Sequence, residues 1–207
     1  MDRIYEAAAK YVALEQFEYE FILSHNRRKK RIRVNFKDED FFHLTGIQCL
    51  TDIDIPRNKK KLLDAILFKK IISDEVLQKS QFFHYPKHDK DIKSRITELR
   101  FLEEYLDNNN MIRIFTTRNQ KGLCSQINAE YIIESRLLGS TSTVYIFLKQ
   151  REDDPEYYCV ISFFKKDRIT YGGDILYWMQ KKKIRIHDRS DKILFQHPYY
   201  HEFLHDS

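Results

Sequence analysis

The sequence predicts an α+β fold, in which helical segments fill the first half of the chain and an antiparallel sheet follows in the second. Before residue 110, apolar side chains recur mainly at intervals of three and four residues, which is the spacing of amphipathic helices. After Met111, short runs rich in β-branched and aromatic residues alternate with loops, which is typical of antiparallel strands in a meander. A chain of 207 residues is long enough for one well-filled core, so we expect a single domain.

The first predicted element is a helix over residues 2 to about 23, where Ile4, Ala8, Tyr11 and Leu14 follow the helical spacing. Residues 24–26 end it. Residues 31–36 then alternate charged or polar with apolar side chains, which predicts a half-buried strand within the basic run 27–36.

A short helix is predicted next, because acidic residues 38–40 suit the positive end of the helix dipole and Gly46 can adopt the left-handed conformation that ends a helix. His43 would lie in its last turn. There the dipole favours a protonated imidazole and would raise its pKa towards the working range of an acid or base. A histidine between apolar neighbours is, however, also a common structural residue.

The remaining predicted elements follow the same two periodicities. Helices are expected over residues 59–70, 74–79 and 89–108. Strands are expected over residues 111–117, 129–137, 143–149 and 157–164, and residues 183–187 and 193–195 are either edge strands or irregular.

Composition permits a polyanionic ligand. The 36 Lys and Arg residues exceed the 31 Asp and Glu residues, and they gather in short clusters that can follow phosphates or simply face solvent. The three cysteines form no CxxC pair, and no apolar stretch is long enough to cross a bilayer. We therefore expect an intracellular, cytoplasmic protein without a disulfide framework, a zinc site or a membrane segment.

Several side chains in the second half could carry chemistry. Thr116, Thr117 and Arg118 lie where the first strand of the meander enters a loop, and they suit either phosphate recognition or local turn bonds. Ser162 lies on a strand predicted to be central, and Tyr171 could donate a hydrogen bond, stack on a base or only cover the sheet edge. The chain has no P-loop, dinucleotide-binding glycine motif, HExxH or two-metal acidic cluster, which favours chemistry without a metal or cofactor.

The chain resembles the PBECR nuclease-like domains, phage and mobile-element relatives of the barnase, EndoU, colicin ribonuclease and RelE group. The resemblance covers residues from about 15 to about 183. It depends on residues 35–46 with their Phe-His-Leu-Thr-Gly string, on residues 113–122, on residues 144–148 and on residues 162–164.

This resemblance implies a single nuclease-like domain over residues 1–207, with N-terminal helices packed on a roughly four-stranded antiparallel sheet at about residues 111–187. The helices at about residues 54–110 would be an insertion. RNA would be cleaved on the open sheet face without a metal. Of the active residues, the resemblance carries over only His43.

We therefore expect a toxin-like or mobile-element-associated endoribonuclease. His43 would be the acid or base that assists attack by the 2′-hydroxyl, and the product would be a 2′,3′-cyclic phosphate. From their placement, Arg33 or Arg118 would stabilise the phosphorane, and Ser162 or Tyr171 would position the scissile group. The expected substrate contacts are Arg31, Thr116, Thr117 and Lys165.

Two alternatives from other classes remain open. A non-catalytic RNA-binding module would bind RNA without turnover. An interaction protein would use the helices at about residues 54–110 to bind a partner, such as an antitoxin-like inhibitor.

Overall fold

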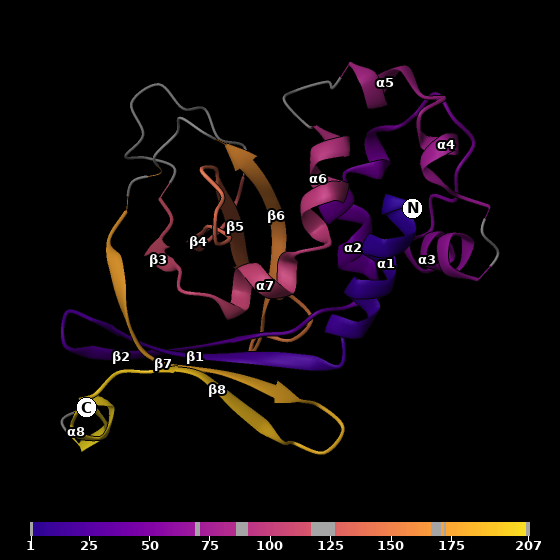
Figure 1. The fold of residues 1–207 in the computed structure, drawn as a ribbon. Helices are drawn as coiled ribbons and strands as arrows, with labels where there is room; N and C mark the ends of the chain where they lie inside the picture. The colour runs from indigo at the N-terminus through magenta and orange to yellow at the C-terminus, as the bar shows by residue number, and fades with distance from the viewer. Residues whose placement is uncertain are drawn as a thin grey trace.

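The computed structural model describes residues 2–68, 71–85, 91–116, 127–166, 171 and 173–205. Within these residues the chain forms eight strands and eight α-helices (Figure 1). The strands are β1 (Phe17–His25), β2 (Arg28–Val34), β3 (Met111–Ile114), β4 (Tyr131–Ser135), β5 (Thr143–Gln150), β6 (Tyr158–Lys166), β7 (Ile175–Arg185) and β8 (Asp191–Gln196). The helices are α1 (Arg3–Leu14), α2 (Asp38–Thr45), α3 (Lys59–Leu67), α4 (Asp74–Leu77), α5 (Gln81–His84), α6 (Ile92–Leu99), α7 (Leu102–Asp107) and α8 (Tyr200–His205), with a 3₁₀ turn, η1 (Ile47–Cys49).

The strands close into a barrel, so the prediction of helices packed on a four-stranded antiparallel sheet is wrong. The sheet order is β1-β2-β6-β5-β4-β3-β7-β8, and an additional pairing of β1 with β7 closes the first seven strands into a ring. The meander β3–β6 is antiparallel, as predicted. The ring is mixed because β2 meets β6 in parallel, through the pair Val34 and Tyr158.

The closure was missed because it depends on β1, which the sequence led us to expect as part of the first helix. Helix α1 ends at Leu14, and the chain then enters the strand β1. Tyr19, Phe21 and Leu23 are fully buried at every second position, which is the period of a strand. Pairing with β2 on one side and β7 on the other overrides the helical spacing in this segment.

A tight turn joins β1 to β2. Asn26 and Arg27 both have positive φ, 51° and 61°, between the paired residues His25 and Arg28. Two-residue hairpin turns favour positive φ at both central positions, because that twist matches the twist of the flanking strands. The turn therefore holds the basic residues that follow it at the exposed end of a hairpin.

The predicted helix over residues 89–108 is two helices, α6 and α7, separated at Arg100 and Phe101. The break turns α7 into the concave side of the sheet. Its backbone carbonyls accept hydrogen bonds from Ser135 of β4 at 2.8 Å and from Lys181 of β7 at 3.0 Å. Helix α7 is thus tied to β4 and β7, the two strands on either side of β3.

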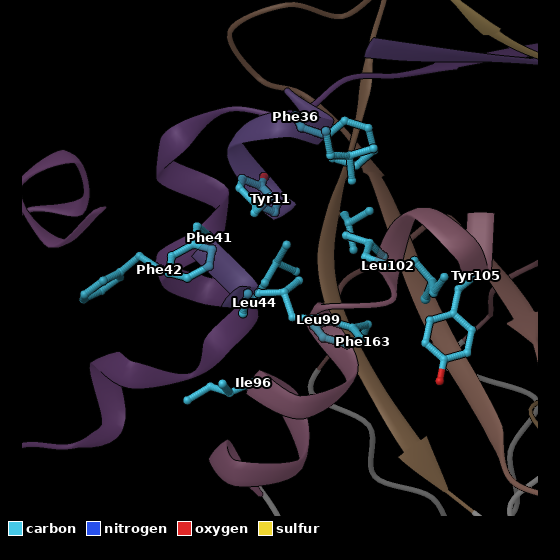
Figure 2. Packing of buried hydrophobic residues seen from close by; sticks show 14 of the residues in the cluster. Tyr11, Phe36, Phe41, Phe42, Leu44, Ile96, Leu99, Leu102, Tyr105 and Phe163 are labelled. Atoms are coloured by element: carbon cyan, nitrogen blue, oxygen red, sulfur yellow. The ribbon is translucent and has the colours of Figure 1, made fainter. Parts of the chain in front are cut away.

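One hydrophobic core joins the helices to the inner face of the sheet. Figure 2 shows rings and aliphatic side chains of α1, α2, α6 and α7 packed around Phe163 of β6. The short helix α2 forms as predicted, with acids in its first turn and Gly46 at φ 76° after its end. It contributes the buried Phe41 and Leu44 to this core.

A second, smaller cluster lies on the opposite face of the meander. Ile133 and Ile146 belong to the main core, whereas Ile132 and Phe147 belong to the second cluster. Because neighbouring residues of a strand point to opposite faces, this second cluster marks the outer face of β3–β6. We call this surface the outer face.

Candidate functional site

His43 lies in the last turn of α2, as predicted, and its side chain is exposed. Loss of solvent around the ring lowers the pKa of the imidazole, and nearby Lys59 lowers it further, whereas Asp40 opposes the change. The expected rise in pKa is therefore wrong, because burial and the charge of Lys59 lower the pKa of the imidazole.

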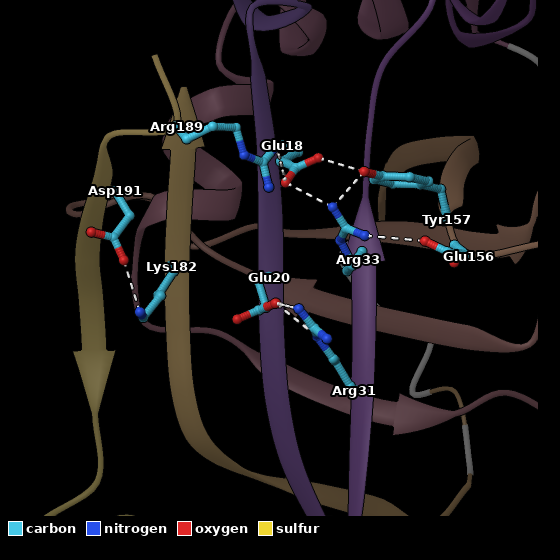
Figure 3. Close-up of polar contacts among 9 residues, drawn as sticks. All are labelled: Glu18, Glu20, Arg31, Arg33, Glu156, Tyr157, Lys182, Arg189 and Asp191. Carbon is cyan, nitrogen blue, oxygen red and sulfur yellow. Dashed lines mark hydrogen bonds and ion pairs between the residues drawn. The ribbon is translucent and has the colours of Figure 1, made fainter. Parts of the chain in front are cut away.

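Arg31 and Arg33 project from β2 into a ladder of ion pairs (Figure 3). Arg31 Nε donates to Glu20 Oε2 at 2.7 Å. Arg33 donates to Glu18 at 3.0 Å and to the Tyr157 hydroxyl at 2.5 Å. Both guanidinium groups are thus held by carboxylates of the neighbouring strand β1.

Glu18 is the centre of this ladder and is only 2% exposed. Burial alone raises the pKa of its carboxyl, but the hydrogen bonds from Tyr157 and Arg33 outweigh burial and lower it. Arg189 adds a third contact at 3.0 Å. Both oxygens of Glu18 are therefore occupied, which is the pattern of a structural ion-pair network.

Ser162 and Lys165 lie on β6, and each contacts a residue of α6. The Ser162 hydroxyl accepts a long hydrogen bond of 3.5 Å from Arg95, and Lys165 lies 3.9 Å from Glu98. Burial lowers the pKa of Arg95. These contacts join α6 to the edge of the meander.

Tyr171 is 3% exposed and is the hub of the aromatic cluster on the outer face. Its ring meets that of Tyr145 at a centroid distance of 4.9 Å, and burial raises the pKa of Tyr171 to about 12. Thr116 directly follows Phe115, a residue of this cluster. Its buried hydroxyl has no hydrogen-bond partner in the described part of the chain. Thr117 and Arg118 lie outside the described residues.

The predicted residues therefore fall into separate places. Across the described residues, the contacts of His43 involve α2 and Lys59, and those of Arg33 involve Glu18, Glu156 and Tyr157. The two sets share no residue. Tyr171 lies instead on the outer face, and Ser162 lies at the edge of the same meander.

A polar cluster on the outer face borders Tyr171, and we call it the outer-face cluster. It consists of Arg113 on β3, Glu134 and Arg136 at or just after β4, and Thr143 and Tyr145 on β5. Arg113 Nε donates to Glu134 Oε1 at 2.9 Å, and Arg136 donates to the Thr143 hydroxyl at 2.9 Å. Burial raises the pKa of Tyr145, Glu134 raises it further, and Arg136 and Arg113 oppose the change, so these charges act on one phenol.

The backbone of Gly173 lies directly against β3. Its φ is 137°, and a Cβ at this position would stand 2.0 Å from the carbonyl oxygen of Ile114. Only glycine permits so close an approach. The carbonyl of Gly173 in turn accepts a hydrogen bond from Arg113 at 3.3 Å, which fixes the guanidinium from a second side.

Sequence reasoning singled out the segment that contains Arg113, but it missed Glu134, Arg136 and Tyr145. The available signal was the alternation in β4, because Ile132, Glu134 and residue 136 share one face of the strand. That signal becomes specific only when register is known. Glu134 lies directly opposite Tyr145, and Ile132 lies opposite Phe147.

In the described residues, no group of three or more His, Cys, Asp or Glu side chains could hold a metal ion. None of the described helices combines the length and the apolar composition needed to traverse a bilayer.

A protein-family model described as phage-Barnase-EndoU-ColicinE5/D-RelE like nuclease4, PBECR4, matches residues 3–194. The match confirms the resemblance inferred from the sequence. No curated protein and no solved structure shows a significant match to the chain.

Proposed function

The chain belongs to the PBECR4 family of phage-associated nucleases of the barnase, EndoU, colicin and RelE type, so its substrate is a nucleic acid, and we propose that it is a metal-independent endoribonuclease. We place RNA cleavage on the outer face of β3–β6. The reaction is attack of a 2′-hydroxyl on the adjacent phosphorus, with release of a 5′-hydroxyl and formation of a 2′,3′-cyclic phosphate.

The observation that carries this proposal is the outer-face cluster. Arg113 and Arg136 present two guanidinium groups on one face of the meander, beside a carboxylate and the hydroxyls of Thr143 and Tyr145. One guanidinium group can donate hydrogen bonds to two phosphate oxygens at once, and it stabilises the negative charge that builds on a phosphorane. Arg113 is paired with an acid, as Arg31 and Arg33 are, but Arg136 beside it is exposed and donates to a neutral hydroxyl.

Of the residues predicted from the sequence, Tyr171 and Ser162 would border the phosphate site. Thr117 and Arg118 lie outside the described residues. His43 lies apart from this face, on α2, and is a separate candidate for the proton acceptor, because its imidazole is exposed and its pKa is lowered. A toxin-like role in the cytoplasm and an antitoxin-like inhibitor are part of the same proposal.

Purified protein tests the reaction directly. A DNA strand that contains a single ribonucleotide should be cleaved in EDTA at that ribonucleotide, whereas the all-DNA strand should remain intact. The product should carry a 2′,3′-cyclic phosphate, which mass spectrometry distinguishes from a linear phosphate. Cleavage of the all-DNA strand, or a requirement for added metal, would contradict the mechanism.

The same substrate tests the alternative of a binding module. RNA binding that weakens with salt, without any cleavage over a long incubation, would favour that alternative. His43→Ala then tests the histidine: unchanged cleavage by a folded variant would remove His43 from the site.

A further inference from the structure

Glu134 differs from the buried Glu18 in the state of its second oxygen. Its Oε1 accepts a hydrogen bond from Arg113 at 2.9 Å, while Oε2 has no hydrogen-bond partner among the described residues. Glu18, by comparison, has contacts from Arg33, Arg189 and Tyr157 on its two oxygens. A carboxylate that is held by one oxygen and open at the other is suited to accept a proton.

Position on the sheet places a possible proton donor next to Glu134. Tyr145 is its direct partner across the β4–β5 pair, and side chains that are directly opposite in an antiparallel pair have Cβ atoms about 4.5–5.5 Å apart. The ring of Tyr145 is fixed by Tyr171, with a centroid distance of 4.9 Å and an interplanar angle of 71°. The phenol is therefore held beside the carboxylate by packing on its other side.

Cations are placed on both sides of this pair. Arg113 is held by Glu134 and by the carbonyl of Gly173, and its side chain is 17% exposed. Arg136 is exposed and reaches Thr143 on β5. A phosphate bound between these two guanidinium groups would lie over Glu134 and Tyr145.

We propose that Glu134 is the general base and Tyr145 the general acid of the phosphodiester cleavage, with Arg113 and Arg136 binding the reacting phosphate. This inference rests on the proposed function and assigns its catalytic residues. Glu134 removes the proton of the 2′-hydroxyl as that oxygen bonds to phosphorus. The bond from phosphorus to the 5′-oxygen breaks, and that oxygen leaves with the proton of Tyr145.

Both groups return to their starting states after the product leaves. The proton on the Glu134 carboxyl passes to the Tyr145 phenolate, so no oxidant, metal or further reactant is consumed. The charge on the phosphorane is balanced by the two guanidinium groups while the bonds change.

The test compares two leaving groups. An RNA dinucleotide has a poor leaving group that needs a proton, whereas a nucleoside 3′-(4-nitrophenyl phosphate) releases a nitrophenolate that needs none. Glu134→Gln should lower kcat on both substrates by about 10²–10⁴-fold, the range of general acid–base catalysis. Tyr145→Phe should lower kcat on the dinucleotide but leave the nitrophenyl substrate within a few-fold of the unsubstituted protein.

Glu6→Gln is the matched control, because Glu6 also pairs with one arginine at 2.7 Å but lies on α1. It should retain full activity.

The outcomes separate this assignment from the proposed function. If the unsubstituted protein cleaves neither substrate, the proposed function fails. If it cleaves both and folded Glu134→Gln retains full activity while His43→Ala loses it, the assignment to Glu134 is overturned. Melting curves establish that each variant is folded, and Glu134→Asp gives a second variant, which should retain part of the activity.

Discussion

Lys181 provides a stability test that depends on one buried charge. Its side chain lies on β7 and is 2% exposed. Its ammonium group donates to the carbonyls of Leu106 at 3.0 Å and Asn108 at 2.8 Å and to Asn110 Oδ1 at 3.1 Å. These bonds satisfy acceptors at the end of α7, which a helix cannot satisfy internally.

Burial lowers the pKa of Lys181 from its ordinary value of 10.5 to about 8, and Asp107 opposes the change. A difference of this size corresponds to about 3 kcal/mol. Between pH 8 and 10.5 the unfolded chain binds more protons at this site than the folded chain. The free energy of unfolding therefore rises with pH through that window, by about 3 kcal/mol from this residue.

Urea unfolding of the protein and of Lys181→Met at pH 7.5 and pH 10.5 measures this contribution. The difference in unfolding free energy between the two proteins should shift by about 3 kcal/mol, in favour of the unsubstituted protein at the higher pH. Lys182→Met is the matched control, because its ion pair with Asp191 raises the pKa of Lys182 and gives no such gain. An equal pH dependence for Lys181→Met and the unsubstituted protein would refute the reasoning.

Three further predictions follow from described contacts. Burial and the nearby Asp38 carboxylate raise the pKa of Glu15 from 4.5 to about 8. Between these pH values the folded chain binds more protons than the unfolded chain, so the free energy of unfolding should fall as pH rises. Chemical unfolding at pH 5 and pH 9 should show this fall, and Glu15→Gln should lack it. Gly173→Ala should lower both the melting temperature and the rate of cleavage, because the added Cβ would meet the carbonyl of Ile114. Gly139→Ala is the control: its φ is 78°, its added Cβ would have no atom within 4 Å, and it should cost only about 1–2 kcal/mol of backbone strain. Equal effects of the two substitutions on the melting temperature would contradict the role of the close approach. The double substitution Arg28→Gln and Lys29→Gln removes two exposed charges beside the β1–β2 turn, and it should reduce the slope of log affinity for single-stranded RNA against log salt by about 1.4. The double substitution Lys60→Gln and Lys61→Gln on α3 should leave this slope unchanged. Filter binding to a non-cleavable 2′-O-methyl strand measures the slope for each protein.

Local chemistry made some elements predictable. The acids at residues 38–40 and Gly46 defined α2 to within a residue, because dipole and left-handed preferences act within one turn. The meander was equally predictable, since period-two runs between short loops pair with their neighbours in sequence. Elements whose partners lie nearby could thus be inferred from their own residues.

Elements that depend on distant partners could not. Phe17, Phe21 and Ile22 have spacings compatible with a helix, and only pairing with β2 and β7 makes this segment a strand. The candidate site has the same limit. Glu134 and Tyr145 are separated in sequence by a loop, and their relation as opposite residues depends on the register of β4 and β5.

The long strand β7 sets the order in which this chain can complete its fold. It pairs with β1, β3 and β8, and the edge of β1 that does not pair with β2 finds its partners only in residues 177–185. During synthesis, β1 therefore keeps an open edge until most of the chain has left the ribosome, and such non-local pairings form slowly. The carbonyl of Gly173, which holds Arg113, also arrives only then. A nascent chain would thus gain its closed barrel and its outer-face cluster together, late in its production.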